Sequence, residues 1–341
     1  MNQTIINSDH LVFAFKIISH FPLVIIFIGI IGNSASFLIF RFEKELRAMS
    51  SMVYLSFCCI TDTLSLFTWN LNHFLLPNFD LAMEDFNIHT CRFFQFLQYF
   101  TLQSSALLLG FVSIDRYFTV ISKPGSFVSK LPFGTTKSAF IISSLITITI
   151  GSLNSFMLFT DRLEINQNDT NIVSNKNYKF SLKHDCYILA NGYRIFPNYE
   201  MIHILIYPII SVIIMVLFNT LLIAKLISIH RKKPQNQSKK AQKFFNRTIN
   251  LSVSMLFITF MFIFMCLPAA ICYKYFGGFF FSTDELRATI FLMDSLSFLN
   301  RSFIFFNCFI SNIRFRAFVI RKLKLMLHLT GSSLENQTKE Y

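Results

Sequence analysis

The sequence predicts an all-α membrane protein, a bundle of seven spanning helices followed by a short amphipathic helix. Its 341 residues are 53% hydrophobic and only 14% charged, and their mean hydropathy is +0.51. A water-soluble domain of this size cannot bury so much apolar surface. Seven stretches each reach the roughly 20 apolar residues that cross a bilayer as a helix. These stretches are too long and too continuously apolar for the alternating pattern of a membrane β-barrel.

The seven predicted spans divide the chain into three parts. The spans cover residues 21–40, 52–76, 93–114, 138–159, 201–227, 249–273 and 288–312. The parts are an amino terminus (1–20), a seven-helix domain (21–312), and an amphipathic helix with a tail (313–341). The stretch before the first span lacks a basic start and a small-residue cleavage site, so the first span is expected to act as its own insertion signal.

Basic residues concentrate in the connections that follow spans one, three, five and seven. With the adjacent pair Asp115 and Arg116 left aside and Lys225 included, these connections hold 20 Lys and Arg residues against four acids: Glu43, Glu45, Glu335 and Glu340. The positive-inside rule therefore predicts a multi-pass protein with its amino terminus outside and its tail in the cytosol. The membrane expected to hold it is the plasma membrane. The net charge of +13 is then a topology signal and not a sign of nucleic-acid binding.

A short amphipathic helix is predicted directly after the last span. Apolar residues recur there at intervals of three and four, with Arg and Lys on the other side, as is typical of a helix that lies on a lipid surface. The apolar residues are Phe315, Phe318, Val319, Leu323, Met326 and Leu327. Membrane lipid is thus an expected partner of this segment.

A charged pair stands at the end of the third predicted span. The stretch "VSIDRYFTVISKP" places Asp115 and Arg116 side by side where the apolar run 93–114 stops. Two ionised groups can neutralise each other there, and arginine stays charged while it exchanges one partner for another. Taken alone, the pair is also compatible with an ordinary ion pair at a helix end.

With its surroundings, this pair resembles the signature of rhodopsin-like (class A) G-protein-coupled receptors. In that family the arginine of Asp-Arg-Tyr, here Asp115, Arg116 and Tyr117, exchanges its aspartate for the G protein on activation. The resemblance covers about residues 20–327. Further matches are Gly32 with Asn33, Asp62, Pro208, Pro268 and the sequence "FISNIRFR". The resemblance implies coupling to a heterotrimeric G protein through Asp115, Arg116 and Tyr117.

The resemblance also implies a disulfide between Cys91, 25 residues before Arg116, and Cys186, the only cysteine of loop 160–200. The other cysteines lie in apolar spans, where a buried thiol is expected as a small core residue. They are Cys58, Cys59, Cys266, Cys272 and Cys308. Cys91 and Cys186 alone fall on the predicted oxidising side. Asn2 and Asn168 begin Asn-x-Ser/Thr sequons on that same side, where glycosylation is expected.

Several positions depart from the family's pattern. The helix-four Trp is missing, and the helix-six Trp two residues before Pro268 is replaced by Cys266. The helix-five Tyr is Val216, and the Asn-Pro-x-x-Tyr motif of helix seven is replaced across residues 304–308. Because these positions belong to the family's activation switch, a weakly signalling receptor or a non-signalling decoy stays open.

Three charged residues, Asp62, Asp294 and Arg301, fall within the predicted spans. Each is costly in lipid unless it is paired or hydrated. Asp62 resembles the family's sodium-binding carboxylate, and Arg301 falls at a helix-seven position that lines the same pocket. We expect Arg301 to pair with Asp62 and to replace the sodium ion. The alternative is an Arg301 that points to lipid and extends its long side chain to the interface.

Two residues are candidate contacts in the ligand cavity. Asp294 lies about two turns outward from Arg301 and is predicted to be the counter-ion of a cationic ligand group, or else a solvated or serine-bonded carboxylate. Gln98 stands where an aminergic receptor carries Asp, and Phe298 stands where an opsin carries Lys. Neither a biogenic amine nor retinal is therefore the expected ligand.

Acidic residues gather on the predicted outer loops. They are Asp80, Glu84, Asp85, Asp161, Glu164, Asp169, Asp185, Glu200, Asp284 and Glu285. A solvated face accounts for them, but an acid-lined mouth also suits an extended basic peptide through charge complementarity. Asp185 is the candidate contact in the long loop. In this respect the chain is similar to invertebrate neuropeptide receptors of the FMRFamide type.

The sequence thus predicts a receptor that binds an extracellular ligand, a neuropeptide by preference, and promotes nucleotide exchange on a heterotrimeric G protein. A decoy of the same fold is the alternative. A solute transporter or channel is less well supported, because few polar residues break the apolar cores. No enzymatic activity, cofactor, metal or nucleic-acid partner is expected, since the chain has no phosphate-binding Gly loop and no metal-spaced His and Cys cluster.

Overall fold

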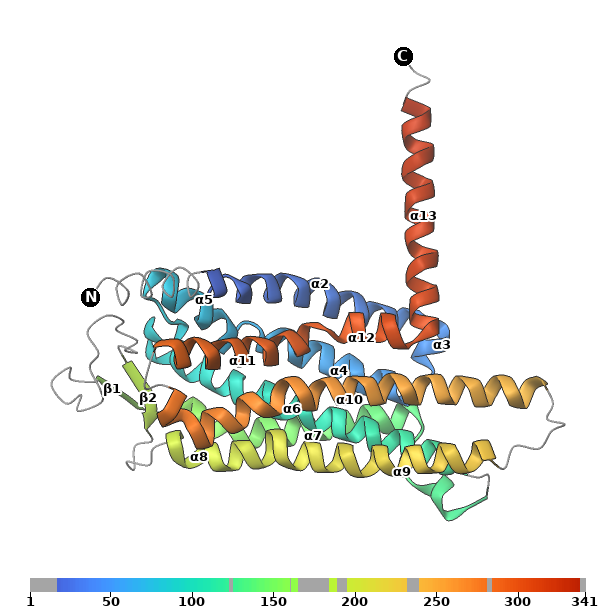
Figure 1. Cartoon of the computed structure of the whole chain (residues 1–341), viewed down its shortest axis with the longest axis horizontal. Helices are drawn as coiled ribbons and strands as arrows, with labels where there is room; N and C mark the ends of the chain where they lie inside the picture. The colour runs from blue at the N-terminus through green and yellow to red at the C-terminus, as the bar shows by residue number, and fades with distance from the viewer. Residues whose placement is uncertain are drawn as a thin grey trace.

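The computed structural model describes residues 17–122, 125–159, 161–164, 184–188, 195–231, 239–280 and 284–337. These residues form an elongated bundle of roughly aligned helices, from which one helix turns sharply away (Figure 1). A two-stranded hairpin, β1–β2, lies at one end of the bundle, which we call the hairpin end (Figure 1). The departing helix, α13, begins at the opposite end, which we call the α13 end.

The helices occur where the seven spans are predicted. They are α2 (Phe21–Phe42), α4 (Ser50–Ser65) with α5 (Trp69–Phe79), α6 (Ile88–Ile121), α7 (Thr136–Asn154) with the 3-10 turn η3 (Ser155–Phe159), α8 (Ile195–Ile204) with the π-helical turn η4 (Leu205–Ile210) and α9 (Ser211–Arg231), α10 (Lys239–Phe280), and α11 (Asp284–Ser302) with α12 (Ile304–Ser311). Six of these stretches are long and apolar enough to span a membrane, and the bent pair α11–α12 makes a seventh. The predicted all-α seven-helix bundle is confirmed.

Short elements join the spans. They are α3 (Lys44–Arg47), the 3-10 turns η1 (Met83–Asp85) and η2 (Phe127–Lys130), and the antiparallel strands β1 (Asp161–Glu164) and β2 (His184–Ile188). After the last span comes α13 (Ile313–Gln337), whose 25 residues make it longer than the short helix predicted. In the hairpin, Leu163 pairs with Asp185 and Glu164 with His184. This hairpin was not predicted, because its two short strands are separated by a long polar segment.

Apolar side chains cover the outside of the bundle. Phe27 of α2, Phe140 of α7 and Phe264 of α10 are 67%, 51% and 70% exposed, respectively. A soluble protein rarely exposes so much connected apolar surface, whereas a lipid bilayer covers it favourably. The interior is correspondingly richer in polar groups, with Asn33 and Asp62 both buried. This arrangement is that of a membrane protein.

Two predicted spans are interrupted, and side chains from neighbouring helices account for both breaks. The second span stops at Ser65 and resumes at Trp69. At this break Gln98 of α6 accepts hydrogen bonds from the Thr68 hydroxyl and, at 3.3 Å, from the Trp69 backbone N–H. These bonds replace part of the helix's own ladder.

The seventh span bends by 58° at Phe303, although no proline occurs there. The Asn33 amide donates to the backbone oxygen of Arg301 at 3.1 Å, and the Ser302 hydroxyl donates to the backbone oxygen of Ile25 at 3.0 Å. A side chain of α2 thus enters the helical ladder of α11, which is a recognised cause of a sharp bend.

The close approach of α2 to this bend requires a glycine. A Cβ atom on Gly29 would lie 2.2 Å from the Leu66 side chain and 2.6 Å from the Ser302 hydroxyl. Gly29→Ala should therefore destabilise the protein by about 1–3 kcal/mol through overpacking. Gly151→Ala is the matched control, because its Cβ would meet only Phe100, at 3.6 Å. Thermal unfolding of the purified protein is the measurement, and equal midpoints for the two variants would contradict the close approach.

At the α13 end, α13 is held to the first connection by charge. Arg314 pairs with Glu45, and Arg321 lies 3.4 Å from Glu43. Phe315 is buried against Phe40 and Phe305. The predicted amphipathic helix is present, and its position on a lipid surface stays a prediction.

Candidate functional site

Asp115 joins three parts of the chain at the α13 end. Its Oδ2 accepts hydrogen bonds from Ser50 Oγ at 2.6 Å and Arg116 Nη2 at 2.9 Å. Its Oδ1 accepts from the backbone N–H of Gly134 at 2.7 Å. Gly134 has φ +80°, a backbone conformation that glycine adopts without strain. The carboxylate therefore links α6 to α4 and to the connection that precedes α7.

Arg116 is a buried cation with few hydrogen-bond partners. Its Nη2 donates to Ser50 Oγ at 2.8 Å as well as to Asp115, while its buried Nε has no hydrogen-bond partner among the described residues. Tyr117, the third residue of the motif, packs its ring against Phe118 and Phe218. Contrary to the prediction of a helix end, α6 continues to Ile121, because no breaker interrupts it. Arg116 thus has hydrogen-bonding capacity left for another partner.

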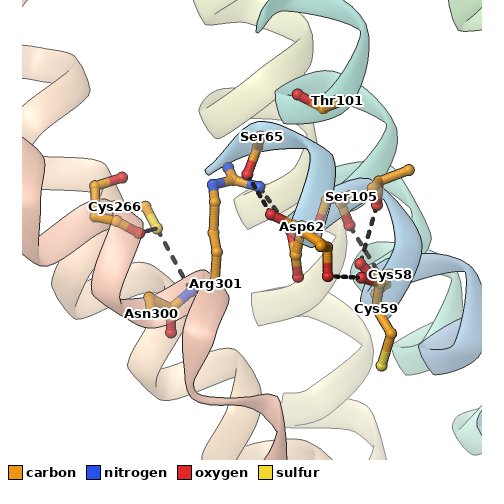
Figure 2. Close-up of polar contacts among 12 residues, drawn as sticks. Cys58, Cys59, Asp62, Ser65, Thr101, Ser105, Cys266, Asn300 and Arg301 are labelled. Atoms are coloured by element: carbon orange, nitrogen blue, oxygen red, sulfur yellow. Dashed lines mark hydrogen bonds and ion pairs between the residues drawn. The ribbon is translucent and has the colours of Figure 1, made fainter. Parts of the chain in front are cut away.

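The centre of the bundle holds a buried ion pair. Arg301 Nη1 of α11 lies 2.8 Å from Asp62 Oδ1 of α4, and Figure 2 shows the two side chains pointing toward each other. Their side chains are 1% and 5% exposed. The structure thus brings together the two charged residues for which the sequence predicted a contact, and Arg301 does not face lipid.

Arg301 also reaches a third helical segment. Its Nη2 donates to the Tyr207 hydroxyl at 3.0 Å, and its guanidinium lies 5.5 Å from the centre of the Tyr207 ring. Tyr207 belongs to η4, where Pro208 occupies a π-helical turn. Beside Arg301, Asn300 donates to the Cys266 sulfur at 3.6 Å (Figure 2). The guanidinium therefore ties α4, η4 and α11 together.

At the hairpin end, Asp294 faces a histidine. Asp294 Oδ2 of α11 lies 3.2 Å from His73 Nε2 of α5, and the two side chains are 14% and 2% exposed. Neither Asp294 Oδ2 nor His73 Nε2 has a hydrogen-bond partner among the described residues, so the contact is an ion-pair contact and not a hydrogen bond. Asp294 lies on the same helix as Arg301, nearer the hairpin end, as the sequence predicted.

The sequence profile of the family described as "7 transmembrane receptor (rhodopsin family)" matches residues 32–312. The chain belongs to this receptor family. No curated protein matches the chain significantly. Membership makes this a receptor with transmembrane helices, and receptors of this family have heterotrimeric G proteins as partners.

The other predicted site residues are Gln98, Asp185, Asn2 and Asn168, and the structure describes the side chain of Gln98 alone among them. Gln98 bonds the break between α4 and α5, as described above, so its side-chain oxygen already has a structural use. The backbone of Asp185 lies in β2, and its side chain lies outside the described part of the structure. The sequons at Asn2 and Asn168 also lie outside the described residues.

The cysteines of the receptor fall into two groups. The five predicted to be free are free, and four of them are buried. Cys91 is disulfide-bonded and buried at the start of α6. The side chain of Cys186 lies outside the described part, so the pairing of Cys91 with Cys186 stays a prediction. In the described residues, no group of three or more His, Cys, Asp and Glu could hold a metal ion.

A buried polar network between α6, α7 and α8 was not predicted. Asn154 donates to Gln103 at 2.8 Å and accepts from the Tyr199 hydroxyl at 2.9 Å, while Gln103 lies 3.2 Å from His203. The His203 ring stacks on Tyr207, the partner of Arg301. The available signal was a set of polar residues inside otherwise apolar spans, but sequence alone does not show that they meet.

Proposed function

We propose that the receptor binds an extracellular peptide at its hairpin end and promotes nucleotide exchange on a heterotrimeric G protein at its α13 end. The observation that carries this proposal is Arg116, a buried cation held by Asp115 and Ser50 at the end that carries α13. The basic connections lie at this same end, which favours a cytosolic α13 end in the plasma membrane.

Acidic groups at the hairpin end favour a ligand that carries positive charge. Asp294 is partly exposed, and its one ion-pair contact within the described residues is with the imidazole of His73, so it is suited to receive a cationic ligand group. The acidic outer loops favour a basic peptide through complementarity. We propose a neuropeptide of the FMRFamide type as the class to test first. Because Gln98 is bonded within the helix break, it is a weaker candidate contact than Asp294.

We further propose that Arg301 does the work of a bound cation. In relatives the carboxylate at the position of Asp62 binds sodium, whereas here a guanidinium nitrogen lies 2.8 Å from it. A covalently attached cation neutralises Asp62 at any salt concentration. The receptor should therefore not need sodium to stabilise its centre.

The first experiment is a screen of amidated neuropeptides on cells that express the receptor with a panel of G proteins, with nucleotide exchange as the readout. An exchange response to a basic peptide supports the proposal. Peptide binding without exchange on any G protein would instead support the decoy, which Cys266 at the helix-six Trp position favours. Ion flux without exchange would support a channel or transporter.

The disulfide makes a separate prediction. If Cys91 bonds Cys186, then Cys91→Ser and Cys186→Ser should each reduce surface expression strongly, and the double variant should be no worse than either single variant. Cys272→Ser is the matched control, because Cys272 is a free cysteine. Surface labelling of intact cells measures the effect, and additive losses in the double variant would argue against the bond.

A further inference from the structure

The contact between His73 and Asp294 has the chemistry of a proton-binding site. The imidazole is enclosed by aromatic rings, with centroids 4.6 Å from Phe291, 5.9 Å from Trp69 and 6.3 Å from Phe298. An ionised group in such surroundings is costly unless it is paired. The side chain of Asp294 is 14% exposed, which leaves a route for protons from water.

The number of protons on the pair decides its net charge. With one proton the pair is neutral overall, whether it is imidazole beside carboxylic acid or imidazolium beside carboxylate. With none, an ionised carboxylate remains in the apolar site, and with two, an unpaired imidazolium remains. Because burial penalises net charge, the contact is most stable with one proton.

The two residues lie on separate segments, α5 and α11. α5 is separated from α4 by the break at residues 66–68, where Thr68 has φ −90° and ψ −120°. Beyond this break, α5 contacts α2, α11 and the first outer connection. The His73–Asp294 contact is therefore one of a few links that position α5 against α11.

Among the described side chains, few other titratable groups lie near the pair. His20, just before α2, packs its ring against Phe74, the neighbour of His73. α2 has no charged residue before Arg41, at the opposite end. α6 faces the start of α5 with Gln98, and on α11 the next charged residue toward the centre is Arg301, seven positions along. In the outer connection, Glu84 accepts a 2.5 Å hydrogen bond from Asn72, the neighbour of His73. Burial raises the pKa of the Glu84 carboxyl, so Glu84 holds its proton to a higher pH than an exposed glutamate.

We propose that His73 and Asp294 titrate as one pair, which carries a single proton while α5 packs against α11, and that this makes the receptor sensitive to pH at its hairpin end. That this end faces the outside of the cell rests on the proposed function. Separated and hydrated, the two side chains lose their protons near pH 3.9 and 6.5, roughly the values of free Asp and His. Above about pH 6.5, the separated His73 and Asp294 side chains bind no proton, whereas the contacting pair still binds one. The contact is therefore weakened as pH rises, by up to about tenfold per pH unit for one proton.

The receptor contains its own probe for this site. Trp69 is the single tryptophan of the chain, it stands in the first turn of α5, and its ring lies next to His73. Tryptophan emission from the purified receptor in lipid nanodiscs, measured between pH 5 and 9, should show a one-proton transition. Asp294→Asn, a close isostere, should abolish it, and His73→Phe, which keeps an aromatic ring, should abolish or displace it. His89→Gln, at an exposed histidine of α6, should leave it unchanged.

Two results would overturn the proposal. One is emission from the parent receptor that does not change with pH. The other is a transition that persists unaltered in both His73→Phe and Asp294→Asn. If one variant fails to fold, the parent titration and the other variant still decide. The readout uses neither peptide nor G protein, so its failure is distinct from a failure of the proposed function.

Discussion

Replacing Arg301 by methionine is expected to destabilise the receptor by about 3–5 kcal/mol, the usual cost of removing one partner from a buried ion pair. Methionine nearly preserves the length of the side chain but leaves the buried Asp62 carboxylate without its cation. The Tyr207 hydroxyl also loses its donor. Thermal unfolding of the purified receptor, together with surface expression, measures the effect.

The control removes both charges. Asp62→Leu combined with Arg301→Met leaves no stranded charge in the centre, and replacing a buried pair by apolar residues is often nearly neutral. The double variant should therefore be much more stable than either single variant. If the double variant loses as much stability as the two single variants together, the two residues contribute independently. That result would contradict a stabilising ion pair between Asp62 and Arg301.

Replacing Arg116 by alanine is expected to abolish nucleotide exchange while surface expression stays near that of the parent receptor. Arg116 has unused hydrogen-bonding capacity at its Nε. Without Arg116, Asp115 still accepts hydrogen bonds from the Ser50 hydroxyl and the Gly134 backbone N–H, so its carboxylate is not left without partners. Asp115 is the only acid that pairs with Arg116 in the described residues. Asp115→Asn should therefore weaken the restraint and raise basal exchange.

Lys130→Ala is the matched control for this prediction, because Lys130 is an exposed cation on the same side of the bundle, in η2. Its exchange activity should equal that of the parent receptor. Normal exchange in both Arg116→Ala and Asp115→Asn would reduce the motif to an ordinary ion pair within a helix. Agonist-stimulated and basal exchange, each normalised to surface expression, are the quantities to compare.

The sequence predicted the number and order of the spans because the membrane imposes a length and a composition on each of them. It also predicted that Arg301 and Asp62 meet, because a charge inside a span has few stable alternatives to a partner. The first prediction follows from the thickness of the lipid bilayer, and the second follows from the pairing of opposite charges inside it. Neither requires knowledge of the detailed packing.

The breaks within the spans could not be predicted in the same way. The interruption at Thr68 depends on Gln98, and the bend at Phe303 depends on Asn33, each contributed by a different helix. Likewise, His73 is an unremarkable residue in the sequence until α11 places Asp294 beside it. Tertiary contacts of single polar side chains, which follow no period, determine these features.

The measurement that tests the account most directly is the thermal stability of the purified receptor in sodium chloride and in choline chloride at equal ionic strength. If Arg301 serves as the cation of Asp62, the parent receptor should have the same unfolding midpoint in both salts. Arg301→Ala, in which Asp62 is free to recruit an ion, should unfold at a higher temperature in sodium, since a ligand that binds only the folded state stabilises it. A parent receptor that sodium stabilises over choline would contradict the account, because the site at Asp62 would then still bind a free ion.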